Sequence, residues 1–212
     1  MIELGVSNFD AASIRAAHAV AQKHGIRVVA NQIMFNLLVS GAPSVKEAVQ
    51  TCNELGIAVV GYGALGQGLL SDGLTRNKAR ANRFARLTGL SFDELSELRA
   101  TIAEIAAGRS VSMAQVCVNW AMRKSVLPLV GIRSVEQLRD TVAATTFELS
   151  EAEVRCLDRA ALSSSTFARP IARRAAFTVF ISCLVTMYRL SHLFADRTAF
   201  FSHERHTSAK IE

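Results

Sequence analysis

The sequence predicts an α/β fold in which parallel strands are covered by helices. Short apolar runs alternate with segments of helical spacing over the first 161 residues. Near-continuous apolar runs are typical of parallel strands that are buried on both faces and joined by helices. Half of the 212 residues are hydrophobic and 20% are charged, which is the composition of a globular protein.

Four strands are predicted from the apolar runs. They are "IELGVS" (2–7), "RVVANQI" (27–33), "IAVVGYG" (57–63) and "VLPLVGI" (126–132). Helical segments separate these runs, so the chain holds four βα units in a row.

Five helix starts are marked by a serine followed three residues later by Glu or Gln. This is capping-box spacing, in which both side chains satisfy free backbone N–H groups. The serines are Ser44, Ser91, Ser112, Ser134 and Ser150. Segment 71–90 has weak periodicity and five cationic residues, and it is predicted to be a long loop after the third strand.

Charge and cysteine content exclude several classes of protein. The net charge is +6, but seven basic and three acidic residues fall in 162–212, so about +4 of it lies there. The rest has an ordinary surface balance, which gives no reason to expect nucleic acid. The four cysteines are far apart, which indicates reduced, buried thiols and no metal site. The N-terminus lacks the pattern of a secretion signal, so a cytoplasmic protein is expected.

One motif suggests a dinucleotide-binding loop of the Rossmann type. Gly61, Gly63 and Gly66 spell G-x-G-x-x-G, the Rossmann dinucleotide fingerprint. That fold also requires a helix that opens in the glycine run and a second strand that ends in an acidic residue about 20 residues on. Neither follows Gly66, so the context argues against a Rossmann loop.

Six motifs together resemble the aldo-keto reductases. They are "GVSNF" (5–9), "NQIMFNLL" (31–38), "ELGIAVVGYGALGQGLL" (54–70), "SMAQVCVNWAM" (112–122), "PLVGIRSVEQL" (128–138) and "ELSEAEVRCLD" (148–158). Their order and approximate spacing match the family over residues 2–161. The resemblance implies a (β/α)8 TIM barrel that binds NADP(H) and reduces aldehydes or ketones, and the four strands resemble strands 5–8 of that barrel.

The resemblance also implies a set of cofactor-binding residues. Ser7, Asn8 and Gln32 would hydrogen-bond the nicotinamide carboxamide, and Tyr62 would stack on the nicotinamide ring. The backbone of Gly63, Leu65 and Gln67 would follow the pyrophosphate. Gly131, Ile132, Arg133 and Gln137 would hold the adenosine ribose and its 2′-phosphate.

Each assignment has a simpler structural alternative. Ser7 and Asn8 could form a strand-to-helix turn, and Tyr62 could be a core residue. Arg133 could be a solvated charge, and Gln137 could serve only as a capping-box partner.

Three residues depart from the family pattern. Gly63-Ala64 stands where the family has Ser-Pro, and Thr141 stands where an Asn is expected. These departures leave open whether NADPH or NADH is preferred.

The family's catalytic residues have no match in this sequence. The Asp, Tyr, Lys and His of the family tetrad lie on strands 2–4, so a chain that starts at strand 5 lacks them. We therefore expect no catalytic residue here, no turnover by this chain alone and self-association through the open barrel edges. A carbonyl substrate would need a complementary half.

Residues 162–212 do not resemble the family. An interfacial membrane helix, a helix packed over the half-barrel and an unevolved, disordered extension are the alternatives for this basic and aromatic tail. Three hypotheses follow for the whole chain: a truncated aldo-keto reductase, a non-catalytic NADP(H)-binding or interaction module, and a membrane-associated fragment.

Overall fold

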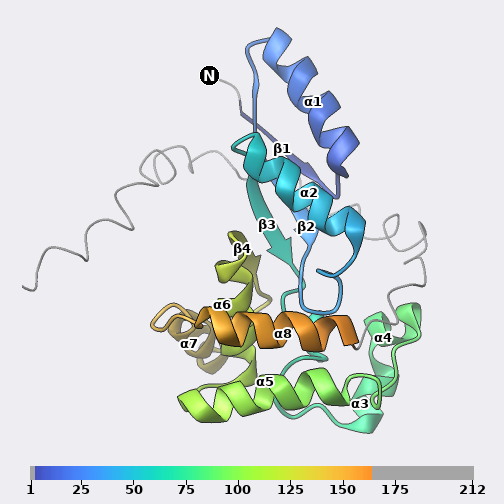
Figure 1. The fold of residues 1–212 in the computed structure, drawn as a ribbon, viewed down its shortest axis with the longest axis vertical. Coiled ribbons are helices and arrows are strands. Elements are labelled where there is room, and N and C mark those ends of the chain that lie inside the picture. The colour runs from blue at the N-terminus through green and yellow to red at the C-terminus, as the bar shows by residue number, and fades with distance from the viewer. Residues whose placement is uncertain (1–2, 164–212) are drawn as a thin grey trace, which may run out of the picture. The chain divides into compact units, whose positions relative to one another are not determined.

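The computed structural model describes residues 3–163 (Figure 1). The chain divides into two units, Met1–Ala175 and Ala176–Glu212, and all the described residues belong to the first. The predicted domain boundary after residue 161 falls within the last described helix. Apart from two residues of that helix, the predicted tail and its membrane alternative lie outside the described residues.

Four parallel strands form the sheet of the described residues. They are β1 (Glu3–Ser7), β2 (Arg27–Met34), β3 (Ala58–Tyr62) and β4 (Val126–Leu129), paired in the order β1-β2-β3-β4. The four predicted strands are thus confirmed. The last one ends at Leu129 rather than at residue 132, because the chain leaves the sheet at Val130.

The strand order separates two kinds of α/β fold. Doubly wound sheets reverse their order at a switch point, whereas barrel sheets add each new strand beside the previous one. Here every strand pairs with its neighbour in sequence. Gly61 lies inside β3, and the glycine run continues into a short 3-10 turn, η1 (Gly66–Gly68), rather than an α-helix. Both findings agree with the rejection of a Rossmann loop.

Helices connect the strands and pack against them. The helices are α1 (Ala11–Lys23), α2 (Pro43–Glu54), α3 (Arg76–Ala81), α4 (Arg83–Thr88), α5 (Ser96–Arg109), α6 (Met113–Arg123), α7 (Val135–Ala143) and α8 (Glu151–Ser163). α1 contacts β2, α2 contacts β3 and α6 contacts β4, so each of these helices lies against the strand that follows it. α5 packs against both α6 and α8 (Figure 1).

The predicted capping boxes are mostly present. Ser112 and Ser134 accept hydrogen bonds from the backbone N–H groups three residues on, and Ser91 and Ser150 form reciprocal boxes with Glu94 and Glu153. The Ser91 box caps a turn, since α5 begins only at Ser96.

The prediction at Ser44 was wrong. α2 begins at Pro43, one residue earlier, and its N-cap Ala42 makes no side-chain hydrogen bond. Proline is preorganised for the first helical position, so Ser44 falls inside the helix.

The prediction of a long loop at 71–90 was also wrong, because the segment contains α3 and α4. Thr75 caps α3 by accepting from the Lys78 N–H, at 3.3 Å, and Asn82 caps α4 by accepting from the Ala85 N–H, at 3.1 Å. Gly89, with a φ of 73°, ends α4. Local caps therefore define two short helices that periodicity does not reveal.

The core lies between the sheet and the helices. Phe35 stacks on Trp120 with ring centroids 5.2 Å apart, and both rings are buried. Cys52 and Cys117 are buried free thiols, as predicted, whereas Cys156 is a free thiol that is only half-buried. Burial raises the pKa of Cys117 to about 12.

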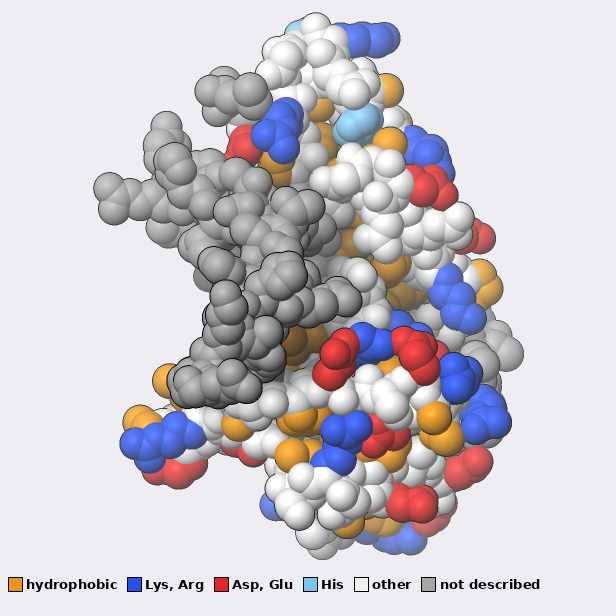
Figure 2. Space-filling model, turned by 60° about the vertical axis from the view of Figure 1, so that its left-hand side comes forward, with side chains coloured by type: hydrophobic (Ala, Val, Ile, Leu, Met, Phe, Trp, Pro, Cys, Tyr) orange, Lys and Arg blue, Asp and Glu red, His pale blue; other side chains and the backbone are white. Residues whose placement is uncertain are grey.

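The described surface carries charges of both signs. Figure 2 shows basic and acidic side chains interspersed over the face that it presents, with hydrophobic side chains between them. Among residues 3–163, no helix is long and apolar enough to cross a membrane.

Candidate cofactor site

A cavity of about 900 Å³ lies at the carboxyl ends of β3 and β4. It is lined by the loop that follows each of these strands, together with parts of α6 and α7. Seven of the predicted cofactor residues line it: Gly63, Leu65, Gln67, Gly131, Ile132, Arg133 and Gln137. Residues predicted from two separate motifs thus meet around one cavity.

The loop after β3 is wound through left-handed backbone conformations. Gly63, Gly66 and Gly68 have φ values of 71°, 56° and 93°, and Gln67 joins them at 55° although it is not a glycine. No acceptor among the described residues takes the N–H groups of Ala64, Leu65 or Gln67. Unpaired N–H groups in turns of this kind form anion-binding concavities.

The loop after β4 leads into the N-terminus of α7. Ser134 caps the helix by accepting from the Gln137 N–H, at 3.2 Å, and Gln137 Oε1 accepts from the Arg133 N–H, at 2.8 Å. Gln137 therefore has a capping-type contact and also lines the cavity. At Gly131 a Cβ atom would meet nothing within 4 Å, so the backbone there borders open space.

Charged side chains of both signs line the cavity. Two carboxylates line it, but both already accept hydrogen bonds. Asp72 Oδ2 accepts from the Met113 N–H at 3.1 Å, and Asp140 accepts from Ser112 Oγ and Gln115 Nε2 at 2.9 and 2.7 Å. Among the described residues of the lining, Arg133 is the only cation, and its side chain is exposed. A guanidinium beside a helix N-terminus can bind a phosphate group.

The other four predicted residues gather at the carboxyl ends of β1, β2 and β3, outside the cavity lining. Ser7 Oγ donates to the Gln32 carbonyl at 3.0 Å, and the Tyr62 hydroxyl donates to Asn8 Oδ1 at 3.1 Å. Asn8 has a left-handed φ of 56°, as the turn alternative requires. Burial raises the pKa of Tyr62, so its hydroxyl keeps its proton and donates.

The chain links the two groups directly. Tyr62 ends β3, and Gly63, the next residue, lines the cavity. A single ligand could therefore extend from the Tyr62 ring into the cavity.

Three residues that support the site were missed by sequence reasoning. Asn36 donates to the Gly63 carbonyl at 2.8 Å, Asn82 donates to the Gln67 carbonyl at 2.9 Å, and Arg99 donates to the carbonyls of Leu69 and Ser71. Asn36 lies inside the quoted motif "NQIMFNLL", which could have drawn attention to it. No local signal marks Arg99, since its partners lie about 30 positions earlier in the chain.

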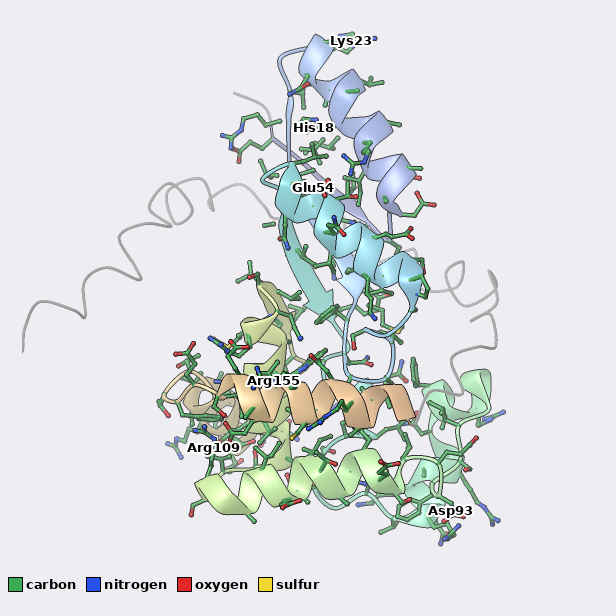
Figure 3. The ribbon with its side chains drawn as sticks, in the orientation of Figure 1. His18, Lys23, Glu54, Asp93, Arg109 and Arg155 are labelled. Carbon is green, nitrogen blue, oxygen red and sulfur yellow. The ribbon has the colours of Figure 1, made fainter. Side chains whose placement is uncertain are left out.

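The described residues contain no group of three or more His, Cys, Asp or Glu side chains that could hold an ion. His18 lies on α1 (Figure 3) and His24 ends that helix, so neither follows a strand.

Comparisons with known proteins agree with the geometry. The family model for "Aldo/keto reductase family" matches residues 2–161. A chloroplastic pyridoxal reductase of Arabidopsis thaliana is 30% identical over 161 residues, which cover 76% of this chain and 44% of that protein. Norsolorinic acid reductase B of Dothistroma septosporum is 28% identical over 76% of this chain and 41% of its own length.

A solved structure shares the fold. A thermostable aldo-keto reductase in complex with the inhibitor epalrestat superposes with a TM-score of 0.53 at 24% identity, over 74% of this chain and 47% of that chain. The chain thus spans less than half the length of the relatives compared here. With the family match extending from β1 through most of α8, the chain belongs to the aldo/keto reductase family.

Proposed function

We propose that this chain provides the NADP(H)-binding part of an aldo-keto reductase barrel, in which hydride passes from NADPH to the carbonyl carbon of an aldehyde or ketone. The observation that carries the proposal is the cavity at the ends of β3 and β4, lined by seven residues that the family motifs select. Ligands of TIM-barrel enzymes bind at this face.

In this proposal, β1 to β4 correspond to strands 5 to 8 of the barrel. The order of the six motifs supports this register. The sheet, in which each strand pairs only with its sequence neighbours, is what any four consecutive barrel strands would form. Phosphate groups in such barrels frequently bind at the loops after strands 7 and 8, which correspond here to the loops after β3 and β4.

The residues around the cavity fit the phosphate groups of NADP(H). The N–H groups of Ala64, Leu65 and Gln67 would hold the pyrophosphate, because they need acceptors. The Arg133 guanidinium and the N-terminus of α7 would hold the 2′-phosphate. Gly131 would let the ribose approach the backbone, because its Cβ position is open.

The residues at the ends of β1 to β3 fit the nicotinamide. Tyr62 would stack on the ring, with its hydroxyl held by Asn8. Ser7, Asn8 and Gln32 would meet the carboxamide, which has both a donor and acceptors. When bound, NADPH supplies the hydride, and these residues determine which face of its ring points to the substrate.

The proton that the reduced carbonyl oxygen needs is proposed to come from a complementary half of the barrel. In the proposed register, the family's Asp, Tyr, Lys and His would belong to strands 2–4 of that half. This chain alone is therefore expected to bind NADPH without turning over a carbonyl substrate. A non-catalytic NADP(H)-binding module would use the same cavity in the same way.

Titration of the full chain with NADPH and NADH, followed by calorimetry, tests the proposal. We expect saturable binding with a preference for NADPH. Arg133→Met should weaken NADPH binding roughly 10- to 100-fold, the range for a lost charged hydrogen bond, and leave NADH binding nearly unchanged.

Lys23→Met is the matched control, because Lys23 lies at the end of α1 (Figure 3) and its loss removes the same charge. Absence of saturable binding of both nucleotides would reject the proposal.

A further inference from the structure

Side chains from three parts of the chain hold the carbonyl groups of loop 63–71. Asn36 bonds the Gly63 carbonyl at the start of the loop, and Asn82 bonds the Gln67 carbonyl in its middle. Arg99 bonds two carbonyls at its end, with Nη1 at 2.6 Å from the Leu69 oxygen and 2.9 Å from the Ser71 oxygen. The loop is thus fixed from outside at its start, middle and end.

These contacts oppose the intrinsic preference of the loop. A left-handed conformation is unfavourable for a non-glycine residue, and it persists only where the surroundings enforce it. Gln67 has such a conformation, and its own carbonyl is the one that Asn82 holds. The same Asn82 side chain accepts the Ala85 N–H, so its amide is fixed at both ends.

The direction of the Ala64 N–H group follows from the held Gly63 carbonyl. Within one peptide group, the C=O and the N–H of the next residue point in opposite directions. Because the Gly63 carbonyl is turned toward Asn36, the Ala64 N–H points away from Asn36. Ala64, Leu65 and Gln67 all line the cavity, and their N–H groups take no acceptor among the described residues.

Arg99 has the environment of a structural clamp rather than of a surface charge. Its side chain is half-buried, and burial lowers the pKa of its guanidinium, while the neighbouring Asp72 carboxylate acts in the opposite direction. Asp72 in turn accepts the Met113 N–H at the start of α6. Arg99 therefore connects the loop to α5, in a region that α6 also borders.

We propose that Arg99, Asn82 and Asn36 form a clamp on loop 63–71 that fixes the loop conformation in which its free N–H groups meet the pyrophosphate of the bound dinucleotide. Arg99 is the main positioning residue of this clamp, since it holds two carbonyls. The inference rests on the proposed function, but none of the three side chains was assigned to the cofactor by the family motifs.

Two variants test the clamp in the full chain. Arg99→Met removes the hydrogen bonds from Nη1 to both carbonyls. Asn82→Ser keeps a capping hydroxyl for α4 but loses the amide donor. We expect Arg99→Met to weaken NADPH binding roughly tenfold or more and Asn82→Ser by about threefold. Arg99→Lys should restore most of the affinity, because an ammonium can also donate to two carbonyls.

Hydrogen exchange of the unliganded chain provides a readout that does not depend on the cofactor. Backbone N–H groups in 63–72 should exchange faster in Arg99→Met, while those of α6 keep the wild-type rate. Arg86→Met, on the exposed side of α4, is the matched control and should change neither readout.

The outcomes distinguish the clamp from the proposed function. If the wild-type chain binds NADPH and both variants bind it within twofold of wild type, the clamp is rejected while the proposed function stands. If the wild-type chain binds neither NADPH nor inorganic pyrophosphate, the proposed function fails. Hydrogen exchange is then the only test of the clamp. If the backbone N–H groups of residues 63–72 exchange at the wild-type rate in Arg99→Met, the clamp is also rejected. If Arg99→Met does not fold, Asn82→Ser decides by the same criteria.

Discussion

Helices α6 and α7 flank the same strand, β4, but they differ sharply in burial. Eight of the 11 residues of α6 are buried, whereas no residue of α7 is. Both helices are amphipathic and both begin at a capping serine. The local sequence therefore favours a helix equally in the two segments. Their burial differs because of what packs against each helix.

The apolar face of α7 is intact but uncovered in the described structure. Val135, Leu138 and Val142, at helical spacing, are 57%, 46% and 56% exposed. Leu127 and Leu129 on the edge strand β4 are also exposed, at 39% and 50%. A stripe of this kind normally faces a core, so the β4 and α7 side is where further structure would pack.

A matched pair of leucine truncations tests this difference in burial, and it should give the largest effect. Leu157→Ala, at a fully buried position on α8, should lower the free energy of unfolding by about 2–5 kcal/mol, because it removes packed methyl groups and leaves a cavity. Leu138→Ala, on the open face of α7, should change it by less than about 0.5 kcal/mol. Urea unfolding followed by circular dichroism measures both. Equal losses would mean that α7 is covered in solution.

Polar substitution of the exposed stripe tests whether that face drives self-association. We propose that the full chain associates through its open edges, since unpaired parallel strands are normally covered. The triple variant Val135→Thr, Leu138→Gln, Val142→Thr should reduce the associated fraction severalfold in sedimentation velocity. A wild-type chain that is a single monomer with a sharp melt would contradict this prediction.

Much of the fold could be predicted because its signals are local. Apolar runs located all four strands, and serine capping patterns located most helix starts. Helix predictions were wrong where the local signal was weak or where another residue determined the start of the helix. Pro43 moved the start of α2 ahead of Ser44, and the caps Thr75 and Asn82 produced two short helices that have no clear apolar period.

Sequence motifs select the residues of the cavity lining that follow directly after a predicted strand. The motifs select Gly63 and Gly131, which both line the cavity, since glycine-rich turns after strands are visible in sequence. Arg99 could not be found in this way. Its role depends on the packing of α5 against the loop end, and charge alone does not distinguish it from solvated arginines.

The ion pair between α5 and α8 should make the stability of the packed α5–α8 pair sensitive to acid. Arg109 on α5 (Figure 3) donates to both carboxylate oxygens of Glu153 at 2.6 Å. These hydrogen bonds lower the pKa of Glu153 to about 2 from an ordinary value of 4.5. Because the folded pKa is the lower one, the stabilisation is complete above about pH 4.5 and is lost as the pH falls toward 2.

Glu153→Gln therefore removes a pH-dependent contribution to the free energy of unfolding. At pH 7 it should cost about 1.5 kcal/mol, within the range for hydrogen bonds to charged groups. Between pH 4.5 and pH 3, thermal melting should fall less steeply in the variant than in the wild type. Parallel pH profiles for the two proteins would rule out the ion pair as the acid-sensitive element.

The smallest effect should come from the two capping serines, which make nearly the same bond in different surroundings. Ser112 accepts the Gln115 N–H at 3.1 Å, and Ser134 accepts the Gln137 N–H at 3.2 Å. Ser112 Oγ also donates to Asp140 Oδ2 at 2.9 Å, which ties the start of α6 to α7. Ser112→Ala should thus cost about 1 kcal/mol, whereas Ser134→Ala, at an exposed helix end that can fray into water, should cost about 0.5 kcal/mol. Chemical unfolding of both variants at pH 7 measures the two values. A larger loss at Ser134 would mean that α7 is as strongly coupled to the core as α6, because fraying would then no longer limit the cost of losing its cap.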